Sequence, residues 1–370
     1  MPETLTLPLI SPPNSPERSR PVVRLATFSG LIALSAALLT GCNRAAEAPQ
    51  AKDAGGVVNV YSARHYDADK ALYATFTERT GVKVNVVEGN AQQLIARMQS
   101  EGAAGPADLF ITADAGALWR AQEAGLLQPL TTPALAAAVP ANLRDPEGRW
   151  WGFQRRARVV AYDAAKVKPE EVDTYEEVAG PRFRGKLCVR SSDNIYNLSL
   201  TGALIEAWGA EKTRTWAKGV VANLARQPEG GDRDQIRAVG AGACEIALTN
   251  SYYYIRMAAG DDAADKAITE RVKLAFPSLD GQGSHLNISG VGLTATSKHR
   301  DAAVRLIEFL VSPEAQTARS AANGEFTLPG VPTPPPTAAW ADFKAHPMPV
   351  SAYGPRQAEA QTLMSAAGWR

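Results

Sequence analysis

The sequence has 370 residues, of which 45% are hydrophobic and 21% are charged, and 39 Lys and Arg residues stand against 38 Asp and Glu residues. This composition is that of an ordinary globular protein with room for about two domains. The formal net charge of +1 and the lack of any Lys-rich or Arg-rich run exclude a strongly basic surface that would bind phosphate backbones, so we expect no nucleic acid partner.

The N-terminal part of the sequence has the pattern of a lipoprotein signal. Three arginines precede a charge-free stretch of 15 residues at 25–39, which suits the apolar region of a signal peptide and is too short to span a bilayer comfortably. The stretch runs into Leu39-Thr40-Gly41-Cys42, which looks like the lipobox of bacterial lipoproteins. A secretory signal with a chance cysteine is the alternative. We predict a signal peptide at 1–41, lipidation of Cys42 and a flexible tether at 42–56.

Removal of the signal peptide would leave 36 basic and 36 acidic residues, a formal balance of zero. Of the three cysteines, Cys42 carries the lipid in this interpretation, which leaves Cys188 and Cys244. Two remaining cysteines in an exported chain favour one disulfide bond, and two buried free cysteines are the alternative. Neither cysteine lies in a zinc-binding spacing.

From residue 57 the sequence alternates short β-rich runs with helical patterns. The first part predicts, in chain order, a strand at 57–61, a helix at 66–80, a strand at 83–87, a helix at 92–100, a strand at 109–111 and a helix around 118–119. Such a βαβαβ run predicts parallel strands with right-handed crossovers.

A second region of the same character follows the Trp150-Trp151-Gly152 segment. It predicts strands at 158–162, 186–189 and 245–248, with helices near 199–209, 212–223 and 234–240. The last part predicts a strand at 288–293 and helices at 302–311 and 313–322. Two α/β lobes whose sheets exchange strands would leave a cleft between them, which is where such folds bind ligands.

Motifs of catalysis are scarce. The sequence contains no GxSxG, P-loop or HExxH motif, and Gly281-Gln282-Gly283-Ser284-His285 lacks the third glycine of a dinucleotide-binding turn. None of the four histidines has a metal-site spacing to another. We therefore predict that the protein is not an enzyme. A redox or hydrolytic enzyme of the cell envelope that uses Cys188, Cys244 or Ser192 is the alternative from a different class.

The unusual feature is the placement of tyrosines. Four of the ten lie where predicted strands end and helices begin, namely Tyr66, Tyr196, Tyr252 and Tyr253. The first follows the strand at 57–61 and the last two follow the strand at 245–248, so we expect them in loops at the carboxyl edge of a sheet, facing the cleft. Consecutive tyrosines usually divide between core and surface, so the joint pattern is what points to function.

Three motifs together resemble the ferric-iron-binding proteins of bacterial ABC importers: Tyr61-Ser62-Ala63-Arg64-His65-Tyr66, Tyr196 about 130 residues later, and Asn250-Ser251-Tyr252-Tyr253. The resemblance spans essentially residues 57–370. It implies a two-lobed periplasmic-binding-protein fold of the class II type, with mixed, mostly parallel sheets and a hinged cleft. We expect an N-lobe formed by 57–155 plus 279–328 and a C-lobe formed by 156–278 plus 329–370.

The resemblance also implies a metal site, because tyrosines from both lobes hold the iron in that family, often with a histidine. Carried over to this sequence, the metal ligands would be His65, Tyr66, Tyr196, Tyr252 and Tyr253. Tyr254 departs from the ligand pair, and we expect it to pack against its lobe. A synergistic anion such as carbonate completes the site in some family members, and the sequence leaves this open.

The chemistry of iron agrees with such a ligand set. Fe(III) favours anionic oxygen donors, and tyrosine supplies one when the metal displaces a proton whose usual pKa is about 10. Binding should then release protons and weaken at low pH. Arg156 and Arg256 match family arginines near the metal and would offset the negative charge of four phenolates around Fe(III). For either arginine, a solvated surface position is the alternative.

The function that the resemblance implies is that of a monomeric, lipid-anchored solute-binding protein in the periplasm or cell envelope. It would capture ferric iron, close by hinge motion near 151–156 and 277–281, and deliver the iron to the permease of an ABC importer. Its contact with the membrane would be through the N-terminal lipid only. The alternative within the binding class is a carrier of sulfate, phosphonate, polyamine or thiamine, in which the tyrosines line the ligand site and Arg156 clamps the ligand.

Overall fold

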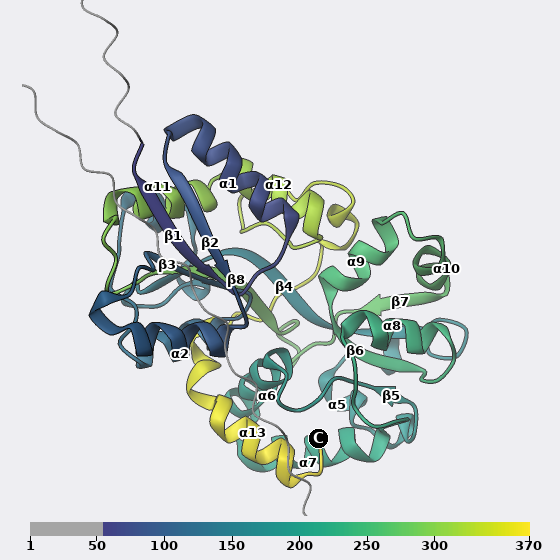
Figure 1. The fold of residues 1–370 in the computed structure, drawn as a ribbon. Helices are drawn as coiled ribbons and strands as arrows, with labels where there is room; N and C mark the ends of the chain where they lie inside the picture. Colours follow the sequence, from purple (N-terminus) through teal and green to yellow (C-terminus); the bar gives the residue numbers. More distant parts are fainter. Residues whose placement is uncertain (1–54) are drawn as a thin grey trace, which may run out of the picture. The chain divides into compact units, whose positions relative to one another are not determined.

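The computed structural model describes residues 55–370. The predicted signal peptide, the lipidated Cys42 and all but the last two residues of the predicted tether lie outside this part. The described chain is an α/β structure built on one mixed sheet of eight strands (Figure 1). Within residues 55–370, no helix is long and apolar enough to cross a membrane.

The first three strands confirm the predicted βαβαβ run. Strands β1 (Val57–Ser62), β2 (Lys83–Glu88) and β3 (Leu109–Thr112) are parallel. They are connected by helices α1 (Asp67–Thr80) and α2 (Ala91–Glu101). Helix α1 ends where the sequence predicts, because Gly81 adopts the left-handed conformation (φ 71°) that closes a helix with little strain.

The long strand β4 (Trp150–Asp163) belongs to both halves of the sheet. Its first part, to Ala157, pairs antiparallel with β8 (Leu286–Leu293). From Arg158 onward it pairs antiparallel with β6 (Ile246–Asn250) and β7 (Val272–Ala275). The prediction of strands exchanged between two lobes is thus confirmed, although the strand begins at Trp150 rather than at Arg158.

The strand order is β2-β1-β3-β8-β4-β6-β5, with β7 also paired to β4 and β5 (Leu187–Cys188) parallel to β6. Parallel pairs therefore lie at the two ends of the sheet and antiparallel pairs in its middle. The remaining α-helices are α3 (Ala115–Glu123), α4 (Pro133–Ala138), α5 (Tyr175–Val178), α6 (Ile195–Trp208), α7 (Ala210–Asn223), α8 (Asp232–Gly240), α9 (Ser251–Ala259), α10 (Ala263–Arg271), α11 (Arg300–Leu310), α12 (Pro313–Asn323) and α13 (Gln357–Ala366).

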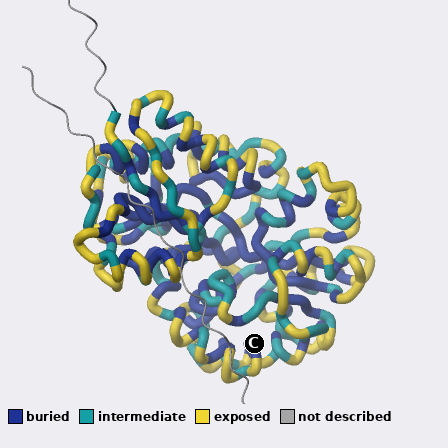
Figure 2. The backbone as a smooth tube through the Cα atoms, viewed as in Figure 1, coloured by how far each residue is buried: buried dark blue, intermediate teal, exposed yellow. Residues whose placement is uncertain are grey.

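The hydrophobic core is divided in the same way as the sheet, and the strands other than β2 and β7 consist mainly of buried residues (Figure 2). One cluster lies around β1, β3 and β8 and contains Trp150 and Trp151. A second lies around β5 and β6 and contains Trp216 and Trp369. A third, smaller cluster lies against α8 and α9. Each half of the sheet therefore has its own core.

The predicted disulfide bond is present. Cys188, at the end of β5, is bonded to Cys244, which precedes β6, and their Cα atoms are 5.8 Å apart. The bond lies in the third hydrophobic cluster. It therefore ties together two segments of the half of the sheet that carries α8 and α9.

Candidate metal centre

All four predicted tyrosines lie at the first turn of a helix. Tyr66 is the N-cap residue of α1, Tyr196 is the second residue of α6, and Tyr252 and Tyr253 are the second and third residues of α9. The prediction of a loop is wrong for the last two, because α9 begins directly after β6. A helix N-terminus presents unpaired N–H groups and the positive end of the helix dipole, both of which favour a negative charge nearby.

The structure brings the tyrosine rings together. The hydroxyl oxygens of Tyr196 and Tyr252 are 3.2 Å apart and share a hydrogen bond in which either can donate. The ring centres of Tyr252 and Tyr253 are 4.1 Å apart, and Tyr66 approaches Tyr252 edge-on at 6.4 Å. Tyr252 is buried, whereas the other three are partly exposed. Three helix N-termini, distant in the sequence, thus build one phenol cluster.

His65 lies at the edge of this cluster, with 55% of its side chain exposed. Its Nδ1 atom is 3.3 Å from Glu88 Oε2 at the end of β2. With Tyr196 and Tyr253 it lines a pocket of about 950 Å³, whose other walls come from α2, α3 and the N-terminal end of α13. The imidazole therefore shares a pocket with two of the tyrosines.

Behind Tyr66 and Tyr252 lies a cluster of buried charges, which we call the arginine cluster. Its three cations and two anions are Arg64, Arg156, Arg319, Asp69 and Glu325, each with a side chain no more than 6% exposed. Arg64 Cζ is 4.6 Å from the centre of the Tyr66 ring, and Arg156 Cζ is 5.7 Å from that of Tyr252. The cluster carries one positive charge in excess beside the phenols.

A second group of charged residues lies behind Tyr196 and consists of Arg158, Arg190 and Asp232. It also carries one positive charge in excess. The buried Asp232 accepts a hydrogen bond from Arg158 Nη1 at 3.0 Å. It also accepts one at 2.9 Å from the backbone N–H of Asn250, which is the residue that precedes α9. Arg190 Nη1 is 3.8 Å from the other oxygen of Asp232, and its Cζ is 5.6 Å from the centre of the Tyr196 ring. Arg190 also lines the pocket.

The two predicted arginines thus occupy different environments. Arg156 is buried in the arginine cluster and donates to the carbonyl oxygens of Ala113 and Ile288. Arg256 is partly exposed, and its Cζ is 5.5 Å from the centre of the Tyr66 ring. Tyr254, expected to pack against its lobe, is buried and donates to the carbonyl oxygen of Val272 at 2.8 Å.

Sequence reasoning missed several charged residues around the tyrosines: Arg64, Arg190, Asp232 and Glu325. Arg64 stands inside the motif that carries the family resemblance, so its position beside His65 and Tyr66 was a usable signal. Glu325 lies 261 residues further along the chain from Arg64, and no sequence pattern connects the two.

Burial keeps the phenols protonated. It raises the pKa of Tyr66 to about 12, with neighbouring Tyr196 and Glu325 acting in the same direction and Arg64 opposing them. The pKa values of Tyr196, Tyr252 and Tyr253 are also raised, mainly by burial. Arg156 opposes the shift for Tyr196 and Tyr252, and Arg190 for Tyr253. At neutral pH the cluster is therefore a set of neutral phenols.

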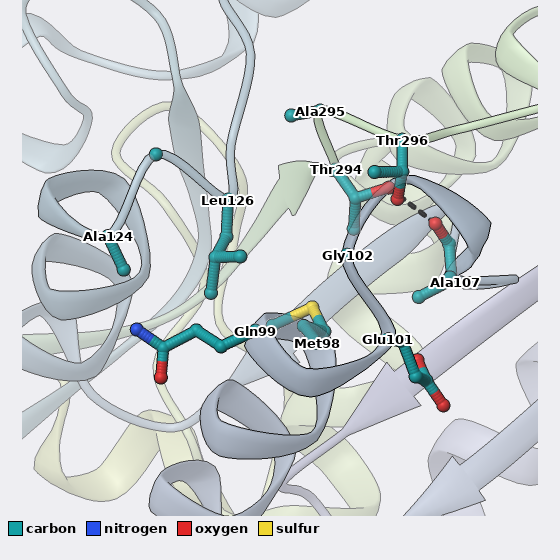
Figure 3. A pocket seen from close by; sticks show the side chains of 12 residues that line it. Met98, Gln99, Glu101, Gly102, Ala107, Ala124, Leu126, Thr294, Ala295 and Thr296 are labelled. Atoms are coloured by element: carbon teal, nitrogen blue, oxygen red, sulfur yellow. Dashed lines mark hydrogen bonds between the residues drawn. The ribbon is translucent and has the colours of Figure 1, made fainter.

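The tyrosine cluster is distinct from a smaller pocket of about 310 Å³ between the end of α2, the segment after α3 and the segment after β8 (Figure 3). Its lining is mainly small and apolar residues, and its one carboxylate, Glu101, accepts a hydrogen bond from the Tyr61 hydroxyl at 2.8 Å. In residues 55–370 no group of three or more His, Cys, Asp or Glu side chains is arranged to hold a metal ion. The oxygen atoms that the structure does bring together in the tyrosine cluster are the hydroxyls of Tyr196 and Tyr252, 3.2 Å apart.

A family model identifies the class of protein to which this fold and pocket belong. Residues 71–348 match the family model of bacterial extracellular solute-binding proteins, and the chain belongs to this family. The protein is therefore a solute-binding protein that serves transport, and it is not an enzyme, as the sequence predicts.

Within this family, the chain is similar to proteins whose names describe iron uptake or ferric iron binding. The chain is 45% identical over 342 residues to Iron uptake protein A1 of Synechocystis sp., which covers 92% of this chain and 95% of that protein. It is 27% identical over 277 residues to the Major ferric iron-binding protein of Neisseria meningitidis, covering 73% and 80%. The structure of Trichodesmium IdiA (FutA) in complex with iron and citrate is 48% identical, with a TM-score of 0.82 over 85% of this chain and 100% of that chain.

Proposed function

We propose that this protein captures ferric iron with the phenolates of Tyr66, Tyr196, Tyr252 and Tyr253 and with the imidazole of His65. The observation that carries the proposal is the convergence of four phenols from three helix N-termini, with the Tyr196 and Tyr252 oxygens 3.2 Å apart. The names of the relatives support the same metal, since they describe iron uptake and ferric iron binding.

The surrounding charges support the same metal. Fe(III) with four phenolates and a neutral histidine carries one net negative charge. The arginine cluster, the group around Asp232 and Arg256 each contribute one positive charge in excess within a short distance of the rings. In this proposal Arg156 and Arg256 have the charge-compensating role expected from the resemblance, and Arg64 and Arg190 share it.

The pocket beside the tyrosines supports a further ligand on the iron. Its volume of about 950 Å³ is far larger than a metal ion requires, and Arg190 on its wall offers a partner for an anion. A small anion such as carbonate would reach the iron from the pocket side, next to Arg190, whereas His65 matches the histidine of family members that bind iron without carbonate. Iron loading with and without bicarbonate, followed by absorbance, tests this step.

Capture would be completed by closure of the two lobes, which we assign to 57–155 plus 279–328 and to 156–278 plus 329–370. The change of pairing partner within β4, between Ala157 and Arg158, supports a hinge at 151–156, since these residues belong to the same strand. The closed, loaded protein would then deliver its iron to the permease of an ABC importer.

The cellular setting in this proposal is the periplasm, with a monomer anchored to the membrane by a lipid on Cys42. The disulfide bond supports an oxidising compartment. Labelling of the expressed protein with a radioactive fatty acid, in wild type and in Cys42→Ser, tests the anchor. Label retained by the variant would contradict it.

The iron proposal is tested by titration of the purified protein with ferric nitrilotriacetate. We expect a visible phenolate-to-iron charge-transfer band to rise to saturation at one iron per protein. The double variant Tyr252→Phe and Tyr253→Phe should lose the band. Tyr254→Phe is the matched control, because its hydroxyl bonds backbone carbonyls away from the cluster, and it should keep the band.

A colourless wild type whose melting temperature does not rise with iron would refute the iron site. Calorimetry of iron-free protein with sulfate, phosphonate, polyamine and thiamine would then identify the alternative cargo. A band of equal strength in the double variant would refute the assignment of its ligands.

A further inference from the structure

Glu325 is the centre of the arginine cluster. It follows Gly324, which ends α12 in the left-handed conformation (φ 70°), and its side chain is 1% exposed. One carboxylate oxygen lies 2.7 Å from Arg156 Nη2 and the other lies 2.8 Å from Arg64 Nη2. Ser289 Oγ on β8 donates to the first of these oxygens at 2.7 Å. A single carboxylate thus holds two guanidinium groups.

The two arginines that it holds face different halves of the tyrosine cluster. Arg64 lies against Tyr66, which follows β1, and Arg156 lies against Tyr252, which follows β6. These two tyrosines come from opposite ends of the sheet. Glu325 therefore fixes one cation beside a proposed ligand from each lobe.

The direct effect of Glu325 on the phenolates is unfavourable. It is a negative charge near Tyr66, and it disfavours a second negative charge on that ring. Any benefit to an anionic metal site must therefore come through the arginines that it orients. Both face the rings at 4.6 and 5.7 Å while bonded to this carboxylate.

We propose that Glu325 is a positioning residue of the metal site, which holds Arg64 and Arg156 where they compensate the charge of the phenolates of Tyr66 and Tyr252. This inference rests on the proposed function. A glutamine at the same place keeps the shape, but its amide group presents N–H donors to a guanidinium that has only donors. Oε1 of Glu325 accepts from both Arg64 Nη1 and Arg156 Nη2, whereas Oε2 accepts from Arg64 Nη2. A glutamine can replace only one of these oxygens, so it loses the negative charge and at least one of the bonds that orient the two guanidinium groups.

The fold has other supports for these arginines, so a variant should still fold. Arg64 Nε is also bonded to Asp69 at 2.8 Å, and Arg156 Nη1 donates to the carbonyl oxygen of Ile288 at 2.9 Å. Loss of the Glu325 carboxylate should thus shift one arginine away from its tyrosine without removing either side chain from the core.

The test measures iron binding by competition with citrate, at one pH and well below the melting temperature. Glu325→Gln should retain iron about 10- to 100-fold more weakly than wild type, the range found when an outer partner of a metal ligand is removed. Its charge-transfer maximum should also move, because the charges beside two coordinating rings have been rearranged. Ser289→Ala should change both quantities in the same direction by a smaller amount.

Glu314→Gln is the matched control. Glu314 lies on α12 and pairs with Arg79 at the surface, where both side chains are about half exposed, so its removal should change neither quantity. Wild-type affinity and an unmoved band in Glu325→Gln, in a protein whose wild type binds iron, would overturn this inference alone. A wild type without the band would overturn the proposed function and this inference together. If Glu325→Gln does not fold, Ser289→Ala decides by the same criteria.

Discussion

Iron binding to this site should release about four protons for each ferric ion, one from each phenol. The number follows from the structure, because all four tyrosines have pKa values raised above 10 and that of Tyr66 is about 12. At neutral pH each ring is therefore a neutral phenol before the metal arrives. Since the metal binds the deprotonated form, its affinity rises with pH and falls as the solution becomes acidic.

The magnitude of this pH dependence is large. With about four protons displaced, the apparent affinity should change by about four orders of magnitude for each pH unit, or about 5.5 kcal/mol. This slope should hold throughout the range in which every ring stays protonated in the iron-free protein. A modest acidification would therefore be enough to unload the protein.

The assay has two parts, which check each other. Protons are counted by pH-stat titration with ferric nitrilotriacetate, after subtraction of those taken up or released by the chelator. The affinity is then measured by citrate competition at several pH values between about 6 and 8, where the phenols remain protonated. Tyr252→Phe should lower both the proton count and the slope by about one, and Tyr254→Phe should leave both unchanged.

Two results would refute the reasoning. One is a wild-type count of two protons or fewer, which would mean that half of the tyrosines are not ligands. The other is an unchanged slope in Tyr252→Phe, since this residue is the most buried of the four and is hydrogen-bonded to a second predicted ligand.

Three further predictions concern stability and are measured by denaturant unfolding. Replacement of Cys188 and Cys244 by serine should lower the free energy of unfolding by about 4 kcal/mol, the chain-entropy value for a loop of this length, and an unchanged midpoint would contradict it. Gly219→Ala should lower it by about 1 to 3 kcal/mol, because the new Cβ would lie 2.4 Å from a backbone carbonyl oxygen, whereas Lys218→Ala on the exposed face of the same helix should change it by no more than about 0.5 kcal/mol. Burial raises the pKa of Glu325, but Arg64 and Arg156 hold it well below its usual range, so its contribution to stability is present above about pH 4.5 and is lost as the pH falls. The acid limb of the stability curve should accordingly flatten in Glu325→Gln.

The elements of the fold that could be predicted are those that depend on local sequence patterns. The helix at 66–80 and the strands around it follow from apolar spacing and from Gly81, and the structure places them within a residue or two. The range of helix α9 was not predicted, because three tyrosines in succession have no helical apolar pattern, and the N–H of its N-cap residue Asn250 is bonded to Asp232, which is 18 residues away. The start of β4 was missed because its Trp-rich beginning has no alternation, being buried throughout.

In the candidate site, too, the residues in local motifs could be predicted and those that depend on long-range contacts could not. The tyrosines could be selected because each stands in a short motif at a predicted strand end. The residues that hold charge beside them could not be selected, since Glu325 is separated from Arg64 by 261 residues and from Arg156 by 169 residues along the chain. Pairings over such distances depend on the tertiary fold and leave no periodicity in the sequence.

Because strand β4 is shared between the two halves of the sheet, neither half can be expressed on its own with a complete sheet. Each half of the sheet contains a different part of β4. In the sequence, β8 belongs to the first half but follows all the strands of the second half. A gene fragment that encodes one lobe would therefore lack strands that its sheet needs, and it should be insoluble. Neither half of the sheet is therefore expected to fold as a separate fragment.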